Sequence, residues 1–72
     1  MLDYEVVRRI TVLSKNENTQ WKKELNLISW NGASAKYDIR DWSPDHRKLS
    51  KGITLTISEM DRLKDVILCG MI

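Results

Sequence analysis

The chain of 72 residues is predicted to form a single α+β domain, with four strands followed by one helix at its C-terminal end. Two observations predict this order. Segments rich in β-branched residues, separated by turn-forming residues, occupy positions 4–56. After residue 56 the spacing of apolar residues becomes that of an amphipathic helix. Because the sequence shows no linker, repeat or low-complexity tract, residues 1–72 are expected to be one domain.

The predicted strands follow one another along the chain. The first covers residues 4–14 (YEVVRRITVLS), and a polar run of turn formers, KNENT, comes after it. The second lies within QWKKELNLISWNG and ends at Asn31-Gly32, a strong hairpin signal. The third is residues 35–42 (AKYDIRDW), and the fourth is GITLT, residues 52–56, after the loop SPDHRKLSKG. The turn signals therefore divide the first part of the chain into four short strands.

The C-terminal segment has the start signal and the spacing of a helix. Thr56-Ile57-Ser58-Glu59 fits a capping box, in which Thr56 accepts from first-turn amides and Glu59 reaches back. The apolar arc after it is wider than one small sheet requires, so we expect a second copy of the helix to cover the surplus across a two-fold axis. The residues expected in that dimer interface are Met60, Leu63, Ile67, Leu68 and Met71.

One helix can cover only one face of a sheet, so the other face is expected to be open. Strand alternation gives the covered face Leu25, Leu27, Tyr37, Ile39, Ile53 and Leu55. In the first strand, alternation puts Arg9 with Val7, Thr11 and Leu13, opposite Val6, Ile10 and Val12. The predicted open face then collects Arg9, Asn26, Trp30, Lys36, Arg40 and Trp42.

Tryptophans beside cations on an open face are typical of binding to single-stranded nucleic acid. Bases stack on aromatic rings at about 1–3 kcal/mol per base, and cations follow the phosphates. Each side chain alone also has a structural explanation: Trp30 as a brace for the hairpin, Trp42 as a cap on the core edge. Arg40 could form a surface ion pair with Asp38 or Glu24. Trp21 shares the parity of the covered leucines, so core and ligand contact both stay open for it.

Composition argues against other classes of protein. The net charge is +2, and the basic residues concentrate in residues 1–56, which favours a polyanionic partner weakly. His46, in a loop, and Cys69, near the end of the helix, form no nucleophilic or metal-binding constellation, and the glycines are too scattered for a phosphate loop. No enzyme activity, metal, cofactor or small-molecule substrate is expected. The lone cysteine and the lack of a secretory signal or membrane-spanning run suit the reducing cytoplasm.

The motifs resemble those of the positive-cofactor-four type transcriptional coactivator domains, which bind single-stranded DNA. The shared residues are DIRDW, then a polar loop with a proline, then KGITLT before a helix. The resemblance is closer to the short bacterial branch, through WKKELNLISWNG and KYDIRDWSPDH, and it covers roughly residues 4–68. It implies a twisted four-stranded antiparallel sheet, a C-terminal helix and a homodimer formed through the helices.

The resemblance also implies a function and candidate site residues. Single-stranded DNA, or in some members RNA, would lie along the face away from the helices, with little sequence preference. The resemblance implies that Arg40, Trp42 and Lys51 contact the DNA. Further candidates for DNA contact are Trp21, Lys23, Trp30, Lys36 and Arg9. Without a Ser- and Lys-rich regulatory tail in this sequence, coactivator activity with eukaryotic factors is not expected. The alternative hypothesis is a protein-interaction module that uses the open sheet face or edge.

Overall fold

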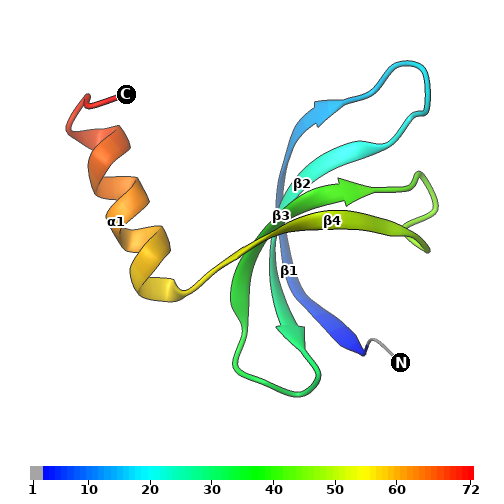
Figure 1. Ribbon diagram of the computed structural model, residues 1–72, viewed down its shortest axis with the longest axis horizontal. Coiled ribbons are helices and arrows are strands. Elements are labelled where there is room, and N and C mark those ends of the chain that lie inside the picture. Colours follow the sequence, from blue (N-terminus) through cyan, green and yellow to red (C-terminus); the bar gives the residue numbers. More distant parts are fainter. Residues whose placement is uncertain (1–2) are drawn as a thin grey trace.

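The computed structural model, which describes residues 3–72, contains one antiparallel sheet followed by one helix (Figure 1). Strand β1 spans Tyr4–Lys15, β2 Lys22–Trp30, β3 Lys36–Trp42 and β4 Leu49–Leu55, and helix α1 spans Ile57–Leu68. The strands lie in chain order, β1-β2-β3-β4, and each pairs antiparallel with its neighbour. The predicted α+β architecture is confirmed, although β4 begins at Leu49, earlier than the predicted residue 52.

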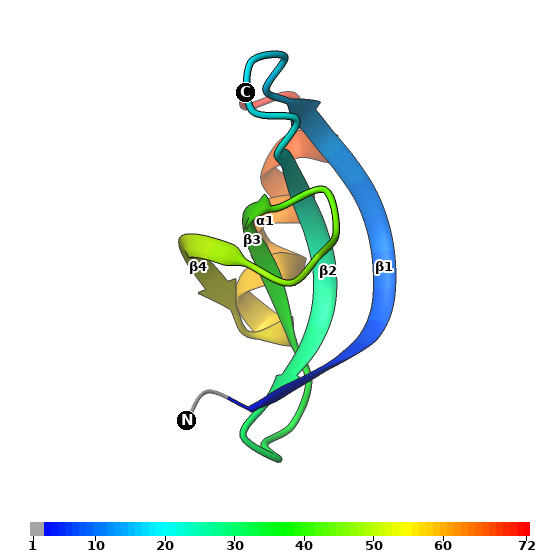
Figure 2. The ribbon, with the colours of Figure 1, turned by 90° about the vertical axis from the view of Figure 1, so that its right-hand side faces the viewer.

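Strand β1 is bent by irregularities along its pairing with β2. The register shifts lie between Val6 and Arg8, between Arg9 and Thr11, and between Val12 and Ser14. Each bulge bends a strand and increases its twist, and Figure 2 shows β1 arched along the sheet. Val6, Arg9 and Val12 therefore lie opposite Ile28, Asn26 and Glu24, and share one face. The predicted separation of Arg9 from Val6 and Val12 is wrong, because it assumed an unbroken period of two.

The sheet bends around the face that points away from the helix (Figure 1). We call this the concave face, and its residues are Tyr4, Val6, Arg9, Val12, Lys15, Lys22, Glu24, Asn26, Ile28, Trp30, Lys36, Asp38, Arg40, Trp42, Leu49, Gly52 and Thr54. The opposite face, which we call the helix-side face, carries Arg8, Thr11, Lys23, Leu25, Leu27, Tyr37, Ile39, Asp41, Ile53 and Leu55.

The most deeply buried side chains lie on the concave face, contrary to the prediction that this face is open. Ile28 and Trp42 are 0% and 1% exposed, and Asn26 is also buried. On the helix-side face, by contrast, Ile53 is 53% exposed and the other predicted core residues are half-buried. The physical reason is the short connection between β4 and α1, which keeps the helix at one side of the sheet. Among the described elements α1 contacts only β3 and β4, so most of the helix-side face stays uncovered.

Local signals at the helix start and at the β2–β3 hairpin act as predicted. The Glu59 amide donates to Thr56 Oγ1 at 3.1 Å, and the Thr56 amide donates to Glu59 Oε1 at 2.8 Å, so the capping box is formed. Asn31 and Gly32 have positive φ angles of 51° and 77°, as a tight hairpin turn requires. No helix within residues 3–72 has the length and apolar character to cross a membrane.

Gly52 allows the edge strand β4 to approach β3 closely, at the point where it lies opposite Arg40. A Cβ atom at position 52 would collide with Arg40 Cβ and with the carbonyl oxygen of Ile39. Gly52→Ala is therefore expected to lower the free energy of unfolding by about 1–3 kcal/mol, as overpacking does. Chemical denaturation measures this change, and Ser34→Ala, at an exposed loop position, serves as the control. Equal stability of the two variants would show that β4 can move away without loss.

Candidate nucleic-acid interface

Arg40 is held in one orientation by a buried carboxylate. Its Nε and Nη2 atoms donate to the two oxygens of Asp38, each at 2.6 Å, and its Nη1 atom donates to the Ser50 carbonyl at 3.2 Å. The Asp38 side chain is 0% exposed and that of Arg40 is 13% exposed. Because successive residues of a strand alternate, these two residues, two positions apart on β3, share the concave face. The ion pair is thus buried and bidentate, and not the surface pair considered from sequence.

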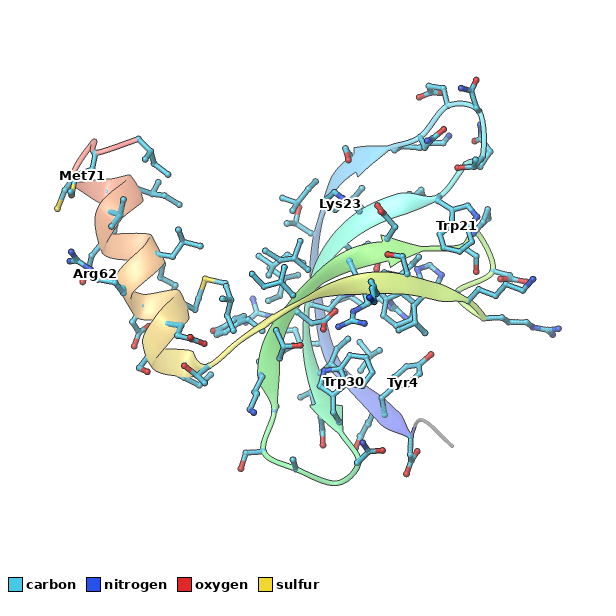
Figure 3. All side chains as sticks on the ribbon, viewed as in Figure 1. Tyr4, Trp21, Lys23, Trp30, Arg62 and Met71 are labelled. Atoms are coloured by element: carbon cyan, nitrogen blue, oxygen red, sulfur yellow. The ribbon has the colours of Figure 1, made fainter. Side chains whose placement is uncertain are left out.

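Trp30 provides an aromatic surface next to this arginine. The guanidinium carbon of Arg40 lies 4.6 Å from the centroid of the Trp30 ring, and the ring of Tyr4 lies 5.4 Å away on a tilted plane. Figure 3 shows Tyr4 and Trp30 close together, on the side of the sheet away from the helix. Trp30, Asn31, Arg40 and Thr54 line an open hollow of about 260 Å³. The structure therefore combines a ring, a flat cation and a space beside them.

Trp42 does not lie on an exposed surface, which corrects its predicted position. Its ring is covered by Tyr4 at 5.7 Å, by His46 at 5.9 Å and by the Arg9 guanidinium carbon at 5.6 Å. Bent β1 brings Tyr4 and Arg9 across the ring, and the β3–β4 loop brings His46. Within residues 3–72, the buried Nε1 atoms of Trp30 and Trp42 have no hydrogen-bond partner. Trp42 thus forms the floor of the site.

Glu24 is a buried carboxylate with partners from three directions. Its Oε1 atom accepts from Arg9 Nη1 and from Asn26 Nδ2, both at 3.0 Å, and its Oε2 atom lies 2.8 Å from His46 Nε2. Burial raises the pKa of Glu24, but the hydrogen bonds from Asn26 and His46 and the charges of His46 and Arg9 outweigh it. The net pKa is below the usual 4.5. The contact with Glu24 holds the His46 ring against the sheet.

The loop between β3 and β4 is ordered by its own hydrogen bonds. The Ser43 hydroxyl donates to Asp45 Oδ1 at 2.8 Å and accepts from the Lys48 amide at 3.0 Å, and the Arg47 amide donates to Asp45 Oδ1 at 3.0 Å. The Arg47 amide and the Ser43 hydroxyl lower the pKa of Asp45 below 3.8. His46 sits in this loop with a φ of 60°, a conformation uncommon for a residue other than glycine. The loop thereby presents His46 toward Glu24.

The remaining candidate residues divide between the two faces. Lys36 is exposed on the concave face, next to the turn end of β3, and Lys51 is exposed on β4. Lys23 lies on the helix-side face and pairs with Asp41 at 3.5 Å. Trp21 is half-buried and lines a different hollow, of about 200 Å³, with Asn16, Thr19, Asp41 and Ser50. Trp21 and Lys23 are therefore not brought together with Trp30 and Arg40.

Sequence reasoning missed the side chains that organise the concave face. Tyr4, Glu24, Asp38 and His46 were not among the predicted site residues, although Asp38 and Glu24 were considered as ion-pair partners of Arg40. The two-residue spacing of Asp38 and Arg40 on a strand was the available signal, because it places both side chains on one face. For His46 and Glu24, which are 22 positions apart, the sequence carries no local signal.

The lowered pKa of Glu24 predicts an acid-sensitive fold. A carboxyl whose folded pKa lies below its unfolded value stabilises the fold above pH 4.5, and this contribution is lost as the pH falls through the folded pKa. Glu24→Gln is expected to lower the free energy of unfolding by about 1–3 kcal/mol at pH 7. The variant should then lose less stability than the wild type between pH 6 and pH 3.

Urea denaturation across this pH range measures the difference, with Glu17→Gln, in the exposed β1–β2 loop, as the control. A parallel loss of stability in Glu24→Gln and the wild type would contradict the role given to the Glu24 carboxylate. Part of the acid sensitivity should persist in every variant, because the pKa of Asp45 is also lowered.

Comparisons with known proteins agree with the motifs and the fold. Residues 17–66 match the family model described as Transcriptional Coactivator p15 (PC4). An uncharacterized protein of Treponema pallidum (strain Nichols) is 52% identical over 64 residues, which cover 89% of this chain and 74% of that protein. The matched family indicates a nucleic-acid-binding protein of coactivator-like function. On these matches, the chain belongs to the Transcriptional Coactivator p15 (PC4) family.

Proposed function

We propose that the protein is a homodimeric, non-catalytic single-stranded DNA-binding protein that accepts most sequences and assists transcription or DNA maintenance. The observation that carries this proposal is the flat pair formed by Trp30 and Arg40, 4.6 Å apart, beside an open hollow. A flat aromatic or guanidinium surface favours unpaired bases, whose faces are free, over a duplex, whose bases stack on each other. Stacking also tolerates every base, which accounts for little sequence preference.

Exposed cations supply the second requirement, attraction to the phosphates. Arg9 and Lys36 are exposed on the concave face, and Arg47, Lys48 and Lys51 are exposed in the β3–β4 loop and on β4. In this proposal, Trp30 and Arg40 contact bases and these cations contact the backbone. Trp42 supports the site from beneath. Lys23 lies on the helix-side face, and Trp21 lies just before β2 beside a separate hollow. We therefore propose that these two residues contact the DNA only where it passes the loop end of the sheet.

The exposed apolar surface of the single chain supports a homodimer. The accessible surface is 5356 Å², whereas a compact monomer of 8.4 kDa would expose about 4,600 Å². The radius of gyration is 13.2 Å, larger than the roughly 11 Å of a compact domain of this length. Ile53, Ile67 and Leu68 are 53%, 52% and 83% exposed. The excess surface is close to the roughly 800 Å² that each partner buries in a standard interface.

The predicted interface residues take different positions around this surface. Met60 is buried within its own chain, while Leu63 is half-buried. Ile67 and Leu68 are exposed on α1, and exposed Met71 lies beyond the helix end. We therefore assign the interface to Ile67, Leu68 and exposed parts of the helix-side face, with Met60 as an internal anchor. The exposed free thiol of Cys69 fits a reducing cytoplasm, where we place the protein.

Titration of a labelled oligo-dT strand tests the binding function. The protein is expected to bind single-stranded DNA, with log affinity falling linearly with log salt at a slope of about −0.7 per phosphate neutralised. Duplex DNA of equal length should bind more weakly, because its bases are not free to stack. Absence of binding to oligo-dT at low salt would refute the proposal. A matched RNA strand, if preferred, would assign the site to RNA, and a pull-down of proteins without nucleic-acid binding would favour an interaction module.

Sedimentation tests the homodimer. At micromolar concentration the wild type is expected to sediment as a dimer, and Ile67→Glu should shift it to a monomer, because two charges would meet in an apolar interface. Arg62→Glu, at an exposed and already charged position on another side of the same helix, is the control and should stay dimeric. A monomeric wild type would contradict the homodimer without affecting the assignment of the concave face.

A further inference from the structure

We propose that Arg40 serves the bound strand as a stacking surface and not as a phosphate partner, and that buried Asp38 is the residue that positions it. This inference rests on the proposed binding of single-stranded DNA, because it assigns a role within the same site. It follows from the hydrogen bonds of Arg40, from its contact with Trp30 and from the contrast with a second arginine, Arg9, on the same face.

The hydrogen bonds of Arg40 direct its charge away from the strand. A guanidinium has five N–H donors. Two of those of Arg40 point to the Asp38 carboxylate, each at 2.6 Å, and another points to the Ser50 carbonyl at 3.2 Å. Three of its five donors are therefore occupied and its charge is already compensated by Asp38, so a phosphate gains less from Arg40 than from an exposed cation. A phosphate that drew Arg40 away from Asp38 would leave that carboxylate, which is 0% exposed, buried without its cation, and this is strongly unfavourable.

The plane of the guanidinium suits it to a different role. Asp38 occupies the edge of the guanidinium that carries Nε and Nη2. The guanidinium carbon lies 4.6 Å from the centroid of the Trp30 ring. Arg40 and Trp30 both line the hollow of about 260 Å³, which also borders Thr54. Thr54 Oγ1 donates to Asp38 at 3.3 Å and so supports the same carboxylate. A base entering this hollow meets a fixed, flat surface, on which arginine stacks well.

Arg9 has the properties that we expect of a phosphate partner on this face. Its side chain is 48% exposed, and one nitrogen contacts Glu24 at 3.0 Å. It lies farther from its aromatic neighbour, at 5.6 Å from the Trp42 ring, than Arg40 does from Trp30. Glu24 also contacts Asn26 and His46, so it would retain two partners if Arg9 turned outward to a phosphate. Arg9 is therefore a matched control for Arg40 on the same surface.

The experiment compares an oligo-dT strand with an abasic strand of the same length, which has the phosphates but no bases. Affinity for each is measured by fluorescence anisotropy at several salt concentrations. The ratio of the two affinities reports the contribution of the bases, and the salt slope reports the phosphates neutralised. The variants are Arg40→Lys, which keeps the charge but loses the flat group, Asp38→Asn, and Arg9→Ala as the control.

Arg40→Lys is expected to lower the affinity ratio by roughly 5- to 150-fold, the range that corresponds to the loss of one stacked base, without changing the salt slope. Asp38→Asn should lower the ratio and steepen the slope by about 0.7, because the released Arg40 can then reach a phosphate. If Asp38 had only a structural role, Asp38→Asn would lower the affinity for the oligo-dT strand and for the abasic strand by the same factor. Arg9→Ala should lower the affinity for both strands by the same factor and reduce the salt slope by about 0.7.

An unchanged ratio in Arg40→Lys would overturn the stacking role. A wild type that binds both strands equally would also overturn it, while leaving single-stranded DNA binding intact. Wild-type protein that binds neither strand would refute the proposed function, and this role with it. Should Arg40→Lys fail to fold, Asp38→Asn decides, because its steeper slope is expected only if Asp38 restrains Arg40.

Discussion

Neutralisation of two buried carboxylates, those of Glu24 and Asp38, organises the concave face. A carboxylate removed from water needs a cation and hydrogen-bond donors, or it destabilises the fold. Arg9 meets this need from the neighbouring strand and Arg40 from the same strand. Both guanidinium groups are thereby drawn toward the sheet, over indole rings at 5.6 and 4.6 Å. The flat surface of the face is thus a consequence of how its buried charge is satisfied.

The bulges of β1 make this arrangement possible. A regular strand would turn Arg9 to the face opposite Val6 and Val12, away from Glu24. The register shifts instead keep all three residues on the concave face and arch the strand (Figure 2), and Tyr4 and Arg9 of β1 lie against the Trp42 ring. The same bulges disrupt the outer edge of β1, which makes it a poor template for another strand. Curvature, burial of the tryptophan and protection of the sheet edge therefore have one structural cause.

Much of the fold was predictable because its signals are local. The Asn31-Gly32 turn and the capping box at Thr56 depend on residues within four positions of each other, and both form as predicted. The buried face was not predictable, because alternation sorts the residues of β2 and β3 into two faces but does not show that α1 contacts only β3 and β4, or that bulged β1 covers Trp42. Of the site, Arg40 and Trp30 were identified, but the burial of Trp42 was not. Its cover comes from β1 and from His46, brought in by long-range pairing.

The separation between neutralised and exposed cations implies how a strand would lie on the protein. At the centre of the concave face, Asp38 compensates the charge of Arg40. That region therefore presents a flat surface with little net attraction for phosphate. Lys36 and Lys51 keep their charges exposed. Phosphates would gain most near these lysines, while bases would gain most at the centre. A single DNA strand with its bases turned toward the sheet would make both the phosphate and the base contacts. A duplex, with its phosphates outside and its bases enclosed, would make only the phosphate contacts.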